Sequence, residues 1–515
     1  MEQIGALDAN FLYTETNSVH NHIASIQILE LPVGQTAKDF IEGLRQVISD
    51  RRHLVPYLTR KLRYTPMNMD HPFWVEDKQF NIDNHIYEVP LETADTSDAG
   101  FSKLQEKIAE LHAVPMDRSK PLWSMQVITG FADRKIAYYN QTHHVCIDGV
   151  SGQLALAMLM DPSAEVRQFE QTTSAGAKDS AQSGNLEMLI QSAENLISFQ
   201  ADNQYRFLGQ IESSVRIGQR TIDPSKQLGA LMEPAPETRF NKTIGSGRSY
   251  AAGQISLADV KRIGKALDCK VNDVFMSVAA GGLRTYLERK GELPDKSLIA
   301  GCPVSLRPPG DESLCNQVTM MKVDLATHPA DPSLRLLAIR DSALTAKEVT
   351  ADLSHGLTTN VSLAGLPALT IAAAQIAEAT SAADYLPPPI NVLISNVPGP
   401  KQKLYSNGAE MLTHYPVSIP AHGNGVNITV QSYVDELYFA VTACQKALPD
   451  PDQLRKDIYA AFEKLKALLI PEKAVTASVS ELTRKPATDA EKVGNDTTKM
   501  PYKNQDTATL VEKVA

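Results

Sequence analysis

Apolar and polar positions alternate or recur at helical spacing from residue 1 to 161, so this part of the chain is expected to be a mixed α/β unit. The predicted strands are 23–29, 124–129 and 136–142. Residues 38–49 carry apolar side chains on one helical face, with Thr36 as the expected N-cap. A second helix is predicted near 103–113, where Ser102 and Gln105 have the spacing of a capping box.

The pattern resumes near residue 246 and again mixes strands with helices. The predicted strands are 297–306, 317–325, 390–395 and a hairpin of 426–430 with 437–441. Two helices are predicted at 332–351 and 365–380, and another begins at residue 271. A further helix is expected to follow a capping box of Ser256 and Asp259. The last helix is expected after Asp450 as N-cap, with Pro451 at the first helical position. We therefore expect a second α/β unit.

Composition changes between and after these two units. Residues 162–187 are rich in Ser, Ala, Gly, Gln and Thr, which predicts a flexible linker. Residues 186–218 return to a helical pattern, whose broad apolar side is expected either to pack on the protein itself or to lie at a membrane surface. Beyond Ile470 little apolar periodicity remains, which predicts a disordered tail. The expected division of this α/β (α+β) chain is 1–161, 162–245, 246–470 and 471–515.

Overall composition is that of a globular protein, and 515 residues exceed one ordinary hydrophobic core. A formal net charge of −10 argues against a nucleic-acid-binding protein. No apolar run is long enough to span a bilayer, and the first residues lack the basic and apolar regions of a secretory signal. The five cysteines form no CxxC pair, which suits a reduced cytoplasmic protein without a zinc knuckle.

The most informative stretch is residues 143–149, His-His-Val-Cys-Ile-Asp-Gly, an HHxxxDG pattern between a predicted strand and an apolar run that can start a helix. Neighbouring side chains of a strand point to opposite faces. His143 and His144 therefore do not both enter one cavity unless the strand breaks between them. We expect one of the two to do chemistry.

The chemistry we expect is general-base catalysis of acyl transfer. A neutral imidazole can remove the proton of an alcohol as the new O–C bond forms, which contributes about 10²–10⁴-fold to the rate. A thioester donor is already activated, so the reaction needs neither an enzyme nucleophile nor a metal. Asp148 is expected to hold the turn, by pairing with an arginine or capping backbone amides, and Gly149 to allow a close approach or an unusual backbone conformation.

Three other interpretations of the motif remain open at this point. A histidine at a strand end is often a structural residue. A zinc site needs three or four convergent ligands, and no matching His/Cys pair accompanies the motif. Cys146 with His144 as its base would form a thiol nucleophile, but the pattern supplies no third group to orient the histidine.

Several short motifs occur in order along the chain and together resemble the bacterial wax ester synthase/diacylglycerol acyltransferase family, within the CoA-dependent acyltransferase superfamily. They are Leu7-Asp8 through Glu15, Pro121-Leu122-Trp123, 143–149, Asn272-Asp273, 303–308, 395–400 and 425–433. The resemblance covers about residues 1–470. It implies two subdomains of the chloramphenicol acetyltransferase type, with mixed sheets and a tunnel between them that acyl-CoA and the acceptor alcohol enter from opposite sides.

The resemblance also implies roles for individual residues. His144 would be the general base, with His143 in support. Asp148 would be structural and face Arg307, and Gly149 would complete the turn.

Three further positions take their expected roles from the same motifs. Asn272 would donate a hydrogen bond to substrate or thioester oxygen, with a helix N-cap as its alternative role. The tunnel wall or CoA entrance would include Ser395, Asn396, Val397, Pro398 and Gly399. Pro121-Leu122-Trp123 is assigned to packing.

The function implied is transfer of a long-chain acyl group from acyl-CoA to a fatty alcohol or diacylglycerol, giving wax ester or triacylglycerol. We expect no permanently bound cofactor, no metal, and peripheral contact with the inner membrane or a neutral-lipid inclusion. Two alternatives are a related HHxxxDG condensation enzyme with another acyl donor, and a catalytically silent lipid-droplet protein. No carrier-protein segment is visible in the chain, and intact His144, Asp148 and Asn272 argue against the silent protein.

Overall fold

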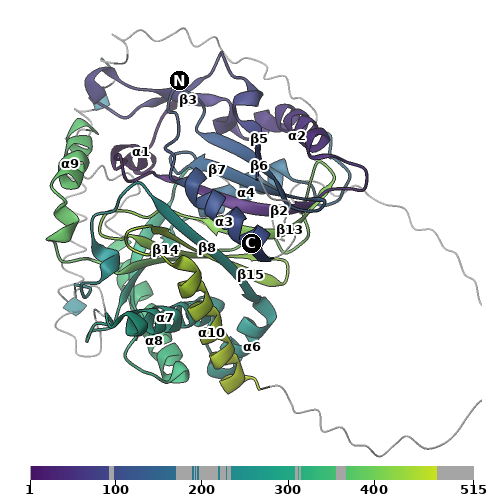
Figure 1. Cartoon of the computed structure of the whole chain (residues 1–515). Helices are drawn as coiled ribbons and strands as arrows, with labels where there is room; N and C mark the ends of the chain where they lie inside the picture. The colour runs from purple at the N-terminus through teal and green to yellow at the C-terminus, as the bar shows by residue number, and fades with distance from the viewer. Residues whose placement is uncertain are drawn as a thin grey trace, which may run out of the picture.

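The computed structural model describes residues 2–91, 98–169, 234–307, 311, 315–354 and 367–471, with the isolated positions 188, 190, 192, 194, 195, 219, 220 and 228. The predicted linker at 162–187, the helical segment at 186–218 and the predicted tail at 471–515 therefore fall mostly outside the described residues. The masked parts are drawn as a grey trace in Figure 1.

A six-stranded sheet in the order β12–β13–β2–β7–β6–β5 forms the centre of the N-terminal half (Figure 1). Its strands are β2 (His22–Glu30), β5 (Ile86–Pro90), β6 (Trp123–Ala132), β7 (Lys135–His143), β12 (Tyr405–Ser406) and β13 (Ala409–Val417). The helices of this half are α1 (Ala6–Tyr13), α2 (Ala37–Arg51), α3 (Asp98–His112) and α4 (Gly149–Leu159). A small sheet in the order β1–β4–β3 lies beside them and contains β1 (Glu2–Gln3), β3 (Arg60–Arg63) and β4 (Phe73–Glu76).

A second six-stranded sheet, in the order β10–β9–β11–β14–β15–β8, forms the C-terminal half. Its strands are β8 (Arg248–Ser256), β9 (Ile299–Ser305), β10 (Val318–Asp324), β11 (Val392–Val397), β14 (Val426–Tyr433) and β15 (Glu436–Cys444). The helices are α6 (Leu257–Leu267), α7 (Val271–Lys290), α8 (Pro332–Ser354), α9 (Pro367–Ala379) and α10 (Pro451–Leu469). Strand β11 pairs in parallel with β9 and β14, so the sheet is mixed, as expected.

The N-terminal sheet also contains strands from the C-terminal half of the chain, β12 and β13. Strand β13, which the sequence pattern did not predict, leaves the C-terminal half and pairs antiparallel with β2, with Tyr415 opposite Ile26. Side chains of the second sheet, among them Tyr250, Tyr433 and Tyr438, are buried in the same hydrophobic cluster as the N-terminal half. The halves therefore share part of one core, which fixes their relative position.

Several predicted helix starts are confirmed. Thr36 caps α2 and accepts a hydrogen bond from the Asp39 backbone at 3.2 Å. Ser256 caps α6 in the same way, through the Asp259 backbone. Asp450 precedes α10 as expected, although its carboxylate makes no capping bond.

The predicted capping box at Ser102 and Gln105 is wrong. Helix α3 begins at Asp98, so both residues lie inside it. Gln105 Oε1 instead accepts a hydrogen bond of 2.7 Å from the backbone N–H of Ala252 in the other half. The Ser-x-x-Gln spacing does not show whether the glutamine side chain bonds to the start of its own helix or to a distant segment, and here it bonds to a distant one.

None of the helices in the described part of the chain combines the length and the apolar character needed to cross a bilayer.

Candidate active site

His143 is the last residue of β7 and is held by the surrounding protein. It lies opposite His22 of β2 and is fully buried. Its Nδ1 accepts a hydrogen bond of 3.0 Å from the backbone N–H of Val145, so its proton is on Nε2, which lies 3.2 Å from Glu15 Oε1. Both ring nitrogens therefore face protein groups, and the ring anchors the turn that follows.

Glu15 connects this turn to the segment between α1 and β2. Its Oε1 also accepts the backbone N–H of Asn21 at 2.7 Å, and its Oε2 accepts Arg118 Nε at 3.1 Å. Burial alone would raise the pKa of Glu15, but the hydrogen bond from His143 and the charge of Arg118 lower it to about 2. The carboxylate is therefore ionised throughout the physiological pH range.

The chain turns between the two histidines, and His144 has a different environment. Its backbone N–H donates to Asn21 O at 2.8 Å, and its ring stacks on Phe11 of α1 with centroids 4.1 Å apart. The residue is only partly buried. Its Nδ1 is buried without a hydrogen-bond partner among the described residues, whereas Nε2 is not buried and accepts no hydrogen bond there. Among the described residues, no group faces His144 Nε2 within hydrogen-bond distance, whereas His143 Nε2 lies 3.2 Å from Glu15 Oε1.

The His144 ring is uncharged at neutral pH, as a general base must be before it accepts a proton. Burial is the largest influence on its pKa and lowers it from 6.5 to about 4, although Asp148 and Asn316 act in the opposite direction. The imidazole is therefore neutral at pH 7 and has a lone pair available to accept a proton.

Asp148 fixes the start of α4 and the end of the motif. It is buried and caps α4, since Oδ1 accepts the backbone N–H of Ser151 at 2.8 Å. Its Oδ2 lies 3.2 Å from Arg307 Nη2 and 3.2 Å from the backbone N of Gln317. The expected pairing of Asp148 with Arg307 is therefore present, and it connects the motif to the strand end of the other half.

Gly149 is explained by a close approach of the other half. A Cβ at this position would lie 3.0 Å from Cγ2 of Val397, at the end of β11. Gly399 is equally constrained, because a Cβ there would lie 2.0 Å from the carbonyl oxygen of Ser432. The predicted segment 395–399 thus reaches the motif at Val397. That the residues 395–399, Val397 included, line a substrate tunnel stays a prediction.

Asn272 does not join this group in the described structure. Helix α7 is preceded by Lys270, whose backbone N–H donates to Asp273 at 2.8 Å, so the alternative role of Asn272 as an N-cap is wrong. Its Nδ2 lies 3.9 Å from Met276 Sδ, and no other described residue bonds to its side chain. Its role as a substrate hydrogen-bond donor stays a prediction.

Cys146 has the wrong environment for a nucleophile. Its thiol is buried, and burial together with the nearby charge of Asp8 raises its pKa well above the ordinary value. The Cys146 thiol is therefore poorly suited to act as a nucleophile. The described residues also contain no group of three or more side chains that would hold a metal ion.

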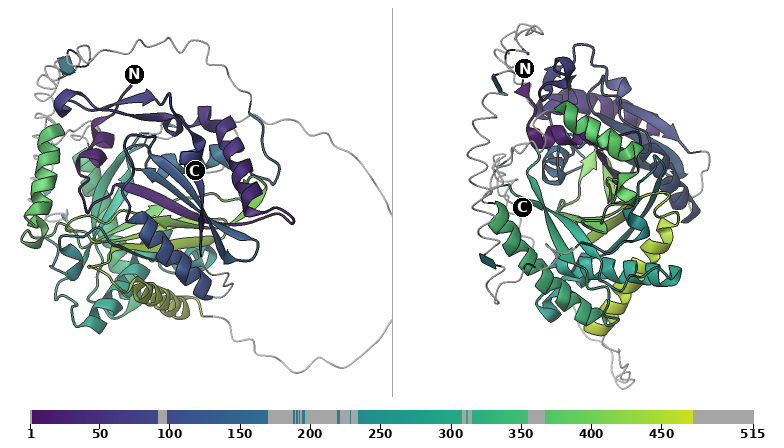
Figure 2. Two further views of the ribbon diagram at one scale, coloured as in Figure 1. Left: turned by 45° about the horizontal axis from the view of Figure 1, so that its top comes forward. Right: turned by 90° about the vertical axis from the view of Figure 1, so that its left-hand side faces the viewer.

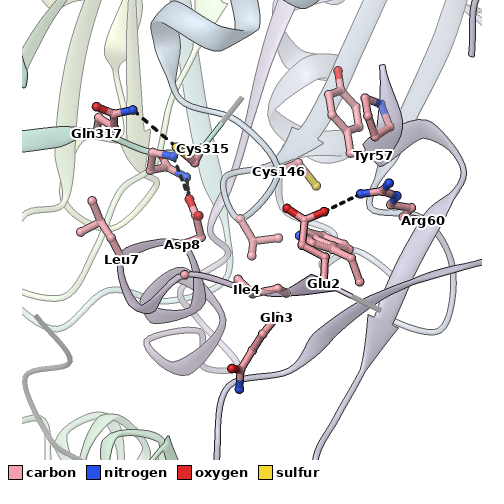
Figure 3. Close-up of a pocket in the computed structure, with 15 residues that line it drawn as sticks. Glu2, Gln3, Ile4, Leu7, Asp8, Tyr57, Arg60, Cys146, Cys315 and Gln317 are labelled. Atoms are coloured by element: carbon pink, nitrogen blue, oxygen red, sulfur yellow. Dashed lines mark hydrogen bonds and ion pairs between the residues drawn. The ribbon is translucent and has the colours of Figure 1, made fainter. Parts of the chain in front are cut away.

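A cavity of about 580 Å³ reaches the motif from the side of Val145 and Cys146. Asp8 and Asn316 form its wall on one side, as Figure 3 shows for Asp8, and Tyr57 and Arg60 on the other. The His144 ring does not line this cavity.

The sequence did not predict that several residues around the motif belong to the site. Asp8, Phe11 and Glu15 belong to the N-terminal pattern that carried the resemblance, but the pattern gave them no role. Asn21 and Asn316 carry no sequence signal, because their importance comes from contacts between distant segments.

Pro121-Leu122-Trp123 packs as expected. Leu122 and Trp123 are buried, and the Trp123 indole donates to Leu58 O at 2.9 Å. The carbonyl of Leu122 accepts the backbone N–H of His143 at 3.0 Å, so this segment also holds the first residue of the motif.

Comparison with known proteins identifies both halves. Residues 4–275 match the model of the wax ester synthase/diacylglycerol acyltransferase catalytic domain, and residues 314–466 match the WS/DGAT C-terminal domain. A protein of Mycobacterium tuberculosis named a putative diacylglycerol O-acyltransferase is 31% identical over 460 residues, which cover 89% of this chain and 98% of that protein.

Solved structures show the same fold. A wax ester synthase/diacylglycerol acyltransferase from Marinobacter aquaeolei VT8 superposes with a TM-score of 0.61 at 24% identity, over 91% of this chain and 99% of that one. The starter condensation domain of rhizomide synthetase, solved with C8-CoA and Leu-SNAC, gives a TM-score of 0.51 at 14% identity, over 91% of this chain and 94% of that one.

Proposed function

The chain belongs to the wax ester synthase/diacylglycerol acyltransferase family, and on that premise we propose that it transfers a long-chain acyl group from acyl-CoA to the hydroxyl of a fatty alcohol or diacylglycerol. The products would be wax ester or triacylglycerol and free CoA. The observation that supports this most strongly is the neutral imidazole of His144, whose Nε2 is not engaged by the described residues.

In the proposed reaction, His144 Nε2 accepts the hydroxyl proton while the alcohol oxygen attacks the thioester carbonyl carbon. The tetrahedral intermediate then collapses with cleavage of the C–S bond. The departing CoA sulfur takes the proton from the imidazolium, so the neutral base is regenerated. No covalent acyl-enzyme is formed, which agrees with the burial and raised pKa of the Cys146 thiol.

Rigid support of the base agrees with this role. His143, Glu15 and Asn21 fix the backbone on one side of His144, and Asp148 with Arg307 fixes the start of α4 on the other. A general base contributes only when it is held within hydrogen-bond reach of the reacting hydroxyl.

Contact with a lipid surface is the second part of the proposal. Helix α9 has one charged residue in 13, Glu378, whose carboxylate turns inward to the backbone N of Asn17 at 3.2 Å. The outward side chains of Leu369 and Ile376 are 59% and 62% exposed. This helix contacts α1, which carries Phe11 (Figures 1 and 2). An apolar, uncharged face beside the site suits a membrane or neutral-lipid surface.

The function is tested by thiol release from palmitoyl-CoA across a panel of acceptors. Purified protein should release CoA with hexadecanol or with diacylglycerol, and each product should be identified by its mass. Absence of release from palmitoyl-CoA, with product formed from a carrier-bound acyl group, would favour the condensation-type alternative. Binding to neutral-lipid emulsions with no release from any acceptor would favour the silent lipid-binding protein.

A further inference from the structure

Residues 315–317, which lie directly before β10 in the C-terminal half, touch both ends of the HHxxxDG motif. The carbonyl of Cys315 accepts Arg307 Nη2 at 2.8 Å, and the backbone N–H of Gln317 donates to Asp148 Oδ2 at 3.2 Å. Between them, Asn316 Nδ2 donates to the backbone oxygen of His144 at 2.7 Å. This short segment is therefore placed to control the geometry of the motif.

Asn316 is in turn fixed by Asp8 of α1. Asp8 Oδ1 accepts both the backbone N–H of Asn316, at 2.9 Å, and its side-chain Nδ2. Both residues are nearly fully buried. Figure 3 shows Asp8 directed from α1 toward this segment. The pair joins the first helix of one half to the other half at the catalytic loop.

These contacts determine how the Asn316 amide is oriented. Its Nδ2 lies between two acceptors, Asp8 Oδ1 and His144 O, so exchange of the amide nitrogen and oxygen would set oxygen against oxygen. The oxygen Oδ1 must therefore face the other way, and it is buried with no partner among the described residues. His144 Nδ1, in the residue that Asn316 holds, is also buried without one.

We propose that Asn316, held by Asp8, is a positioning residue that accepts a hydrogen bond from His144 Nδ1–H when the imidazole acts as a base. This inference deepens the proposed function and rests on it. A proton on Nδ1 leaves the lone pair on Nε2, which is the nitrogen that the substrate hydroxyl must meet. Once Nε2 has taken the proton, the imidazolium donates from both nitrogens, and an acceptor at Nδ1 stabilises it.

The role of Asp8 follows from its charge. Burial raises the pKa of Asp8, hydrogen bonds from Asn316 lower it, and the net pKa is about 6. At pH 7 the carboxylate is mostly ionised and binds the Asn316 donors strongly. Among the described residues around the motif, Glu15 pairs with His143, Arg307 pairs with Asp148, and burial raises the pKa of the Cys146 thiol, while Asp8 is the carboxylate that binds Asn316.

Kinetics with four variants separates positioning from folding. Asn316→Ala should lower kcat by about tenfold to a hundredfold, a part of the general-base contribution, while KM for acyl-CoA changes little. Asp8→Asn should have a smaller effect of the same kind. The exchange variant Asp8→Asn/Asn316→Asp keeps one carboxylate in the pair and an oxygen acceptor for His144 Nδ1–H at position 316. It should therefore recover part of the lost kcat. Asn10→Ala, on the same helix without a side-chain hydrogen bond in the described structure, is the control.

Histidine titration gives a measurement that does not depend on turnover. NMR of ¹³C-labelled histidine, assigned by the signal lost in His144→Ala, reports the His144 pKa directly. The exchange variant Asp8→Asn/Asn316→Asp, which keeps a single carboxylate in the pair, should raise this pKa from about 4 toward 6.5, because a carboxylate replaces a neutral acceptor beside His144, and Asn316→Ala should lower it. An unchanged pKa in both folded variants overturns the inference. Absence of thiol release from the wild type, with the pKa shifts present, instead overturns the proposed function alone.

Discussion

Phe11 lies face to face with His144, with ring centroids 4.1 Å apart and planes inclined by 12°. The phenyl ring covers one face of the imidazole and keeps water from it. Burial is also the main cause of the low His144 pKa of about 4. The first helix of the chain therefore contributes to keeping the base neutral, although it lies more than 100 residues before the motif.

Replacing Phe11 should thus shift the pH dependence of activity. Phe11→Ala admits water to the ring face, so the His144 pKa should rise toward 6.5 by roughly one unit. The acidic limb of kcat/KM, recorded between pH 4 and 8, would move up by the same amount. Phe11→Leu preserves an apolar cover and should shift it less. Identical limbs in wild type and Phe11→Ala would show that the stacked ring does not govern the ionisation.

Glu15 should make stability depend on pH at acidic values. Its folded-state pKa of about 2 is below the ordinary 4.5, so its contribution is fully present above pH 4.5 and is lost as the pH falls toward 2. Glu15→Gln should lower the free energy of unfolding at pH 7 by roughly 1.5–3 kcal/mol, since hydrogen bonds to a charged group are lost.

Urea unfolding from pH 2.5 to 7 measures this effect. The wild type should lose stability on acidification more steeply than Glu15→Gln, and the two curves should converge at low pH. Parallel curves would contradict the assignment of this carboxylate as the anchor of His143.

Gly149 should be intolerant of even one methyl group. Alanine favours a helix over glycine, so Gly149→Ala at the first residue of α4 would ordinarily stabilise the protein. Its Cβ would lie 3.0 Å from Val397 Cγ2, and overpacking of this kind costs about 1–3 kcal/mol.

The double variant Gly149→Ala/Val397→Ala tests that explanation, because it removes the methyl groups that are in conflict. Its free energy of unfolding should exceed the value expected from adding the two single effects. Simple additivity would mean that the cost of Gly149→Ala arises elsewhere.

Charged substitutions on α9 should weaken binding to lipid. Leu369→Glu/Ile376→Glu places two carboxylates on the exposed apolar face, so less protein should float with phosphatidylcholine–triolein emulsions in a density gradient. A matched variant, Leu334→Glu/Leu344→Glu, changes two leucines of α8 that are also exposed, 59% and 50%, and should float like the wild type. Equal flotation of all three proteins would exclude α9 as the lipid-binding face.

The sequence predicted best where structure depends on neighbours in the chain. The end of β7 at the histidines and the cap of α2 by Thr36 are local features, and both were found. The pairing of Asp148 with Arg307 was expected only through the family resemblance. Spacing alone does not show which strand end lies opposite the motif.

Long-range features could not be found in this way. Strand β13 has no special local pattern, and its place beside β2 depends on a partner hundreds of residues away. Gln105 looked like a cap because its contact with Ala252 is invisible in the local sequence. Asn316 is an asparagine in a loop until the fold sets its amide between Asp8 and the His144 carbonyl.

In the proposed reaction, His144 is the base that activates the acceptor hydroxyl. The most direct measurement is CoA release from palmitoyl-CoA and hexadecanol by His144→Gln, compared with the wild type and with His53→Ala, which changes an exposed histidine. With matched thermal unfolding of all three proteins, His144→Gln should lose about 10²–10⁴-fold in kcat while His53→Ala retains full activity. Release by a folded His144→Gln at the wild-type rate would contradict the account.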